Sequence, residues 1–169
     1  MPVLTIQVYQ RAGRILRIMV IVRRATEGDL PRIVELIHLG AVGGVGAEDL
    51  GPPLPERYYQ AFRSFAQFPE AKVMVAELDG AVVGTFQFHL LPSLANGALP
   101  TAEVESVHVA EEFRRRRIGE AMMAWVVDEA RRLGCKRVQL TSNRARTDAH
   151  RFYERLGFVK SHEGMKLTL

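Results

Sequence analysis

The sequence predicts a mixed α/β fold in which helices cover both faces of one sheet, and three observations predict it. Segments with apolar residues at helical spacing alternate with short runs rich in β-branched and aromatic residues. Two such runs, residues 73–78 and 81–90, are joined by Asp79-Gly80, a pair typical of a tight hairpin turn. The chain has 169 residues, 47% of them hydrophobic and 25% charged, which suits one ordinary globular domain.

The first half of the chain supplies a strand, two helices and that hairpin. Residues 20–23 predict the first strand. Thr26 is placed as a helix N-cap, with Asp29 as the reciprocal carboxylate of a capping box. Residues 40–55 are rich in glycine and proline and predict a loop, and a short helix follows over residues 58–65.

The second half continues the alternation of strands and helices. Gly134 ends the longer of its two helices as a C-cap. The expected elements are strands at residues 103–109 and 137–141, helices at 118–133 and 149–156, and closing strands at 158–160 and 165–169. The whole order is therefore β-α-α-β-β-β-α-β-α-β-β, which gives a mixed sheet with helices on both faces.

Charge sets the first eighteen residues apart. They hold three arginines and no acidic residue, and Met19 stands directly before the first expected strand. We expect residues 1–18 to be a flexible extension or an upstream-start segment, and residues 19–169 to form the domain. Removing three positive charges from the total of +4 leaves residues 19–169 nearly neutral, which argues against a protein wrapped in nucleic acid.

Cysteine and histidine usage limits the chemistry. The single cysteine, Cys135, cannot form an internal disulfide, and the five histidines show no metal-ligand spacing. No apolar run has the length of a membrane span. We therefore expect a cytoplasmic protein without a metal and without a membrane partner.

The most informative segment is a strand that runs into a basic turn and then a helix. Residues 114–117 are four arginines, followed by Ile118 and Gly119 at the helix start. Unpaired N–H groups at a helix start carry positive partial charge and suit a pyrophosphate, with Gly119 allowing close approach. A solvated basic helix start would explain the arginines equally well. Neither a P-loop nor a dinucleotide glycine motif is present.

The strand before this turn changes phase. Alternate residues of a regular strand point to one face, and Glu103, Glu105, Val107 and Val109 are alternate residues. The first two are charged and the last two are apolar, so the polar and apolar faces of the strand change places partway along it. A β-bulge near Ser106 would produce this change, and bulges often lie beside active sites. An edge strand with solvated glutamates is the alternative.

Two segments resemble the GNAT N-acetyltransferase superfamily. The turn Arg114 to Gly119 resembles the family signature Arg/Gln-x-x-Gly-x-Gly/Ala. Asn143 resembles the asparagine that follows a strand in this family, and Ala149 to Phe158 resemble the family's last helix. The likeness covers residues 19–169, and the last segment also looks like the aminoalkylphosphonate branch. Arg117 stands where the family has its first glycine. We expect an ordinary helical φ at Arg117 because Gly119 is retained; a positive φ there would put coenzyme affinity in doubt.

The resemblance implies a mostly antiparallel central sheet of six or seven strands. It also implies acetyl-CoA as co-substrate, held between two splayed parallel strands, with its pyrophosphate on the arginine turn. The coenzyme-binding residues that it implies are Val107, His108, Val109, Arg114, Arg115, Arg116, Arg117, Ile118, Gly119, Glu120, Ala121, Asn143 and Tyr153.

Acetyl transfer to an amine requires a base, an oxyanion donor and an acid. For the base we propose Glu103, which matches the histone acetyltransferase branch by spacing, or Glu105, which matches the polyamine branch; both could be surface residues. A backbone N–H near Val107 or Val109 is the expected oxyanion donor. Tyr153 is the proposed acid for the thiolate, and a core tyrosine is its alternative.

The expected function is acetyl-CoA-dependent N-acetyl transfer to a primary amine of a small molecule or peptide, by direct attack in a ternary complex. One rival is a non-catalytic acyl-CoA-binding or regulatory domain. The other is a nucleic-acid-binding module that uses the arginine turn, which the near-neutral charge beyond residue 18 disfavours. We therefore expect no nucleic-acid partner. Short closing strands and an exposed sheet edge are compatible with a homodimer.

Overall fold

Six strands form a single sheet in the computed structural model, which describes residues 3–11, 14–40, 51–95 and 97–169. They follow one another across the sheet in chain order, and all neighbours are antiparallel except β5 and β6, which are parallel. The strands are β1 Val3–Arg11, β2 Arg14–Arg24, β3 Ala71–Leu78, β4 Ala81–Leu91, β5 Thr101–Val109 and β6 Arg137–Leu140.

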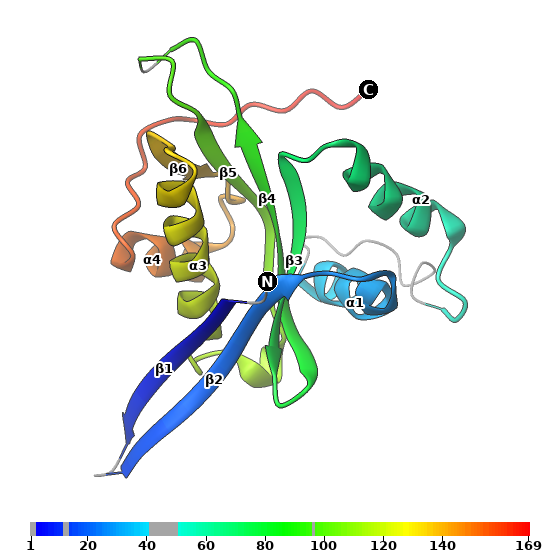
Figure 1. Ribbon diagram of the computed structural model, residues 1–169, viewed down its shortest axis with the longest axis vertical. Coiled ribbons are helices and arrows are strands. Elements are labelled where there is room, and N and C mark those ends of the chain that lie inside the picture. Colours follow the sequence, from blue (N-terminus) through cyan, green and yellow to red (C-terminus); the bar gives the residue numbers. More distant parts are fainter. Residues whose placement is uncertain (1–2, 12–13, 41–50, 96) are drawn as a thin grey trace.

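Helices cover the sheet from both sides (Figure 1). The helices α1 Leu30–Gly40 and α2 Glu56–Ser64 lie on one side, and α3 Ile118–Arg132 and α4 Thr147–Arg155 lie on the other. The predicted mixed, mostly antiparallel sheet with helices on both faces is confirmed. Within the described residues, no helix combines the length and the apolar character that crossing a membrane requires.

The two ends of the chain differ from the predicted element order. The expected strand at residues 20–23 is the end of the longer β2, which pairs with β1 in a hairpin that the sequence analysis did not predict. Residues 158–160 and 165–169, the expected closing strands, have no regular structure. Met165, Leu167 and Leu169 are 93%, 87% and 111% exposed, so this alternating segment finds no apolar surface to cover. The separation of residues 1–18 from the domain stays a prediction.

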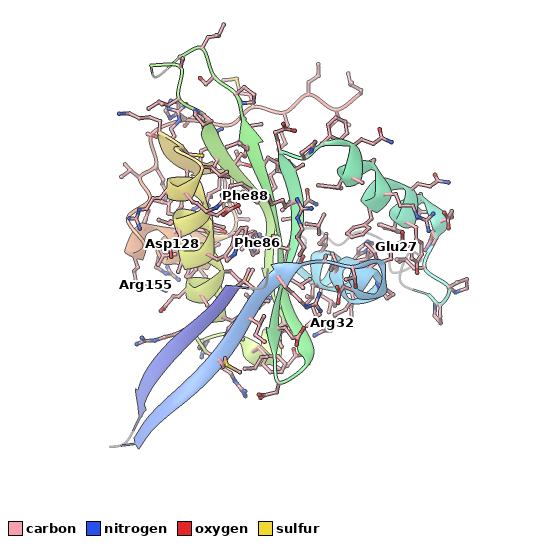
Figure 2. The ribbon with its side chains drawn as sticks, viewed as in Figure 1. Glu27, Arg32, Phe86, Phe88, Asp128 and Arg155 are labelled. Atoms are coloured by element: carbon pink, nitrogen blue, oxygen red, sulfur yellow. The ribbon has the colours of Figure 1, made fainter. Side chains whose placement is uncertain are left out.

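The larger core lies between the sheet and α3. Phe86 and Phe88 point from β4 toward α3 (Figure 2), and their rings lie 5.6 and 5.8 Å from the ring of Trp125. Met122 and Val126 on α3 are fully buried against the same strands. Burying each such side chain contributes about 1.5–3 kcal/mol, so this contact fixes the start of α3 beside the end of β5.

On the opposite face, contacts just before α1 hold that helix to the sheet. The Asp29 carboxylate accepts hydrogen bonds from Arg23 at 2.8 and 2.9 Å and from the Thr26 backbone N–H at 2.7 Å. The Arg23 hydrogen bond lowers the pKa of Asp29 to about 2, so the pair is ionised at neutral pH. Arg23 also donates to Glu77 on β3. The predicted capping carboxylate is therefore confirmed, and it ties α1 to the sheet.

Candidate functional site

The two parallel strands part after four pairs of residues. The pairing of β5 with β6 begins at Thr101 and Arg137 and ends at Val104 and Leu140. β5 continues beside β4 as far as Val109, whereas β6 stops at Leu140. From Glu105 onward, one edge of β5 therefore has no neighbouring strand within the described residues, and a gap opens between the two strands.

Backbone groups of β5 face this gap. The Ala110 N–H donates to the Val83 carbonyl at 2.9 Å, on the side of β4. Because N–H directions alternate along an extended strand, the N–H and C=O groups of Val107 and Val109 point to the other side, into the gap. The carbonyl of His108 lies toward Gly84 on β4. The structure thus brings Val107 and Val109 to the predicted place, while His108 is left with only its side chain for a ligand.

A β-bulge interrupts β5 where the strands part. Thr85 pairs with His108 and Gln87 pairs with Glu105, so Phe86 on β4 faces both Ser106 and Val107. Ser106 has a φ of 50°, in the left-handed region. The predicted bulge near Ser106 is confirmed.

The bulge exchanges the two faces of the strand. Ala102 and Val104 pack into the core before it, and Val107 and Val109 pack against the same core after it. The side chain of His108 therefore lies on the face that Glu103 and Glu105 occupy, although its residue number has the opposite parity. In a regular strand His108 would lie on the face opposite Glu103 and Glu105, so the bulge is what brings the three side chains to one face.

The two glutamates have different surroundings. Glu103 accepts a hydrogen bond from Nε2 of Gln139 at 3.3 Å, and these residues are paired where β5 and β6 are still adjacent. Glu105 is exposed, lies beyond the last β6 pair and has no ion-pair or hydrogen-bond partner among the described side chains. Glu105 is therefore the carboxylate beside the gap.

His108 is held in its neutral form. Its ring lies against Gly40 at the end of α1, where a Cβ would overlap the imidazole. Burial, together with the charges of Arg146 and Arg114, lowers the pKa of His108 to about 4. At neutral pH this imidazole carries no charge, so one of its nitrogens is available as a hydrogen-bond acceptor.

The arginine turn has an unusual backbone. Arg115 and Arg117 have φ angles of 61° and 59°, so the expected helical φ at Arg117 is wrong. All four arginines are exposed, and the first helical bond joins the Ala121 N–H to the Arg117 carbonyl at 3.0 Å. The N–H groups of residues 118–120 precede that bond at the positive end of α3. This arrangement suits a phosphate group.

Replacing Arg117 by glycine should stabilise the protein. A non-glycine residue in the left-handed region costs roughly 1–2 kcal/mol, which glycine avoids, although glycine adds entropy to the unfolded chain. We expect Arg117→Gly to raise the melting temperature by about 2–4 °C, measured by thermal unfolding. Arg116→Gly is the control because Arg116 has no positive φ, and it should not raise the melting temperature. Equal shifts for both variants would contradict backbone strain at Arg117.

Gly119 contacts a side chain of α4. A Cβ at Gly119 would lie 3.1 Å from Cζ of Phe152, so the missing side chain makes room for this ring. The sequence analysis expected Gly119 to make room for phosphates. In the structure its smallness lets α4 approach the start of α3, and α4 carries Tyr153.

Tyr153 lies in an aromatic cluster. Its ring centroid is 5.1 Å from that of Phe152 and 5.7 Å from that of Phe158. Burial raises the pKa of the Tyr153 hydroxyl, and the charge of Arg146 partly opposes this. The hydroxyl therefore stays protonated at neutral pH and is available as a donor.

The segment after β6 borders the gap. The Oδ1 atom of Asn143 accepts a hydrogen bond from the Ala145 N–H at 2.9 Å, which leaves the Asn143 amide N–H groups for other partners. Ser142 precedes it, and its buried Oγ has no partner among the described residues. Sequence analysis did not select Ser142, although its place between a strand and Asn143 was a usable signal. A buried hydroxyl without a partner favours a ligand there.

The face of the sheet that holds the glutamates also carries an apolar cavity. Its volume is about 460 Å³, and Phe65, Phe68, His89 and Leu90 line it. His89 pairs with Glu103 across β4 and β5. This cavity lies where β4 pairs with the first residues of β5, whereas the gap opens beyond Val104. Glu105 lies on the α1 and α2 face and Tyr153 on α4, so the gap is bordered from both faces of the sheet.

Comparisons with known proteins agree on one family. The family model described as "Acetyltransferase (GNAT) family" matches residues 46–158. An aminoalkylphosphonate N-acetyltransferase of Salmonella typhimurium is 37% identical over 108 residues, 62% of this chain and 70% of that protein.

Solved structures have the same fold. A structure described as a transcriptional regulator from Bacillus halodurans has a TM-score of 0.83 and 35% identity, covering 89% of this chain and 99% of that one. The aminoglycoside N-acetyltransferase AAC(6')-Iy in complex with CoA has a TM-score of 0.68 at 18% identity, covering 90% and 95%. The second likeness concerns the fold alone.

Proposed function

Because this chain belongs to the GNAT acetyltransferase family, we propose that it transfers an acetyl group from acetyl-CoA to a primary amine of a small molecule or peptide. The observation that carries this proposal is the gap between β5 and β6, with a bulge beside it. A strand-like pantetheine arm fits the gap because the N–H and C=O groups of Val107 and Val109 face it. The arginine turn and the start of α3 would hold the pyrophosphate.

The two faces of the sheet support direct attack in a ternary complex. Glu105 accepts a proton from the incoming ammonium, directly or through a water, because only the neutral amine is a nucleophile. The N–H of Val107 or Val109 donates to the thioester oxygen as negative charge develops there. Tyr153 donates its proton to the departing thiolate sulfur. The C–N bond forms as the C–S bond breaks, and the second proton that the nitrogen loses as the amide forms returns through water to Tyr153. The proton that Glu105 takes up is released to water.

The acceptor is proposed to be a small molecule. The Salmonella relative is named for aminoalkylphosphonates, and this supports an acceptor of that size. A cytoplasmic location, a homodimer and the absence of a metal stay predictions.

Calorimetry with acetyl-CoA, followed by an amine panel, tests the function. We expect acetyl-CoA to bind at micromolar concentration, ATP to bind far more weakly, and at least one primary amine to be acetylated. No binding of acetyl-CoA would overturn the proposal. Tight binding without turnover of any amine would favour the second candidate, a non-catalytic acyl-CoA-binding domain. That candidate is supported by the 35% identical structure described as a transcriptional regulator.

Paired glutamate substitutions test the base. Glu105→Gln should lower kcat/KM for the amine by about 100-fold, because general base catalysis typically contributes 10²–10⁴-fold. Glu103→Gln is the matched control on the same face and should change kcat/KM by less than about threefold, since Glu103 is bonded to Gln139 where the strands are still paired. The pH–rate profile of each variant checks the assignment. The reverse order of effects would make Glu103 the base.

A further inference from the structure

Residues 165–169 form an apolar arm that covers no part of the domain. Met165, Leu167 and Leu169 alternate with polar residues, and these three apolar side chains are almost fully exposed. Such alternation is typical of a strand with one buried face. Because a row of exposed apolar side chains marks an interaction surface, the arm requires a partner surface that the single chain does not give it.

The sheet has an open edge at β6. β6 pairs with β5 on one side, and its other side pairs with no strand in the part of the chain that the structure describes. A free edge presents backbone N–H and C=O groups that another strand can join. Val138 and Leu140 on β6 pack against the core beneath α3. A strand added at this edge would therefore extend both the sheet and its apolar core.

The arm matches this edge best in one antiparallel register. When Leu167 stands opposite Val138, each apolar residue of β6 faces an apolar residue of the arm, and all four residues of β6 are paired. A shift of two residues one way carries Met165 beyond the end of β6. A shift of two residues the other way places Lys166 opposite Arg137, and like charges directly opposite are destabilising.

The arm does not lie on the β6 of its own chain. The residues just before it are held near the end of that strand, since Glu163 pairs with Arg144 at 3.6 Å. A Cβ at Gly164 would lie 3.8 Å from the Thr141 side chain. From there the chain leads away, and Figure 1 shows its end on the α2 side of the picture, whereas β6 lies on the α3 side. The arm and the edge that it matches are therefore separated within one copy.

We infer that the chain forms a homodimer by exchanging these arms, so that residues 165–169 of each copy form a strand on β6 of the other. Exchange of identical segments is a low-cost route to a closed two-fold dimer, because each copy gives one arm and receives one. Both open edges are then covered, and the apolar side chains of both arms are buried. The exchange requires neither acetyl-CoA nor an acceptor, so it goes beyond the proposed function.

Sedimentation equilibrium measures the association. Wild-type protein should be a dimer at about 10 µM, and Leu167→Asp should weaken the dimer by at least about 100-fold, because each dimer then loses two buried leucines. Val159→Asp is the matched control, since Val159 is 81% exposed and lies outside the arm, and it should change the dimer affinity by less than about threefold. A wild-type monomer at about 100 µM, or a dimer that Leu167→Asp leaves intact, would overturn the inference.

Two single-cysteine variants distinguish exchange from pairing within one chain. Both carry Cys135→Ser; one also carries Thr168→Cys and the other, which is tagged, carries Arg137→Cys, at positions opposite each other in the register. When they are co-expressed and oxidised, a disulfide should link the tagged chain to the untagged one. Val159→Cys in place of Thr168→Cys is the control and should not link. Absence of linked pairs, with an internal disulfide in a chain that carries both Thr168→Cys and Arg137→Cys, would place the arm on its own β6 and overturn the exchange.

Discussion

Tyr153→Phe should lower kcat by about 100-fold or more while leaving the KM for acetyl-CoA within about threefold, because a positioned general acid typically contributes 10²–10⁴-fold. Phenylalanine keeps the ring contacts with Phe152 and Phe158, so it removes only the hydroxyl. Burial raises the pKa of that hydroxyl, which keeps the wild-type donor protonated across the neutral range. Steady-state kinetics over a series of pH values measures the effect.

The control for this prediction is Tyr59→Phe. Tyr59 lies on α2 and contacts Arg63, far along the chain from α4, and its substitution should leave kcat unchanged. Thermal unfolding separates chemistry from folding, since Tyr153→Phe should melt close to wild type. An unchanged kcat in Tyr153→Phe would remove the hydroxyl from the reaction and leave the ring with a packing role.

Gly119→Val should lower the affinity for acetyl-CoA by at least about 30-fold and the stability by about 1–3 kcal/mol through overpacking. A Cβ at Gly119 already lies 3.1 Å from the Phe152 ring, and the larger valine side chain must displace it. Moving Phe152 also moves α4 and Tyr153. Calorimetry with acetyl-CoA and thermal unfolding measure the two losses.

A double substitution identifies the cause. If the collision with Phe152 causes the loss, Phe152→Ala should restore part of the affinity in the Gly119→Val background. Additive losses would instead mean that the new side chain meets the coenzyme phosphates directly. Gly51→Val is the control because no atom lies within 4 Å of a Cβ at Gly51, and it should have little effect.

Local signals predicted the parts of the site that depend on neighbouring residues. The phase change between Glu105 and Val107 predicted the bulge, and Asp79-Gly80 predicted the β3–β4 hairpin, because each feature is determined by a few adjacent residues. The start of α3 at Ile118 was predicted for the same reason.

The features that were missed depend on contacts between distant segments. The closing strands alternate correctly, but alternation does not reveal whether a strand edge is available to pair with them. The contact of Gly119 with Phe152 joins residues that are far apart in the chain. The positive φ of Arg117 is imposed by the turn and is not a preference of arginine. Such features become visible only when the elements are packed together.

The bulge at Ser106 makes β5 sensitive to its length as well as to its composition. Removal of one residue there would restore a regular strand and a continuous ladder with β4, so the domain would still have a sheet to fold around. Glu105 and His108 would then stand two positions apart on a regular strand and would still share a face, because Ser106 is the extra residue of the bulge. Removal of a residue elsewhere in β5 would instead exchange the faces of the side chains on one side of it, so among related sequences a deletion in this strand should occur at the bulge.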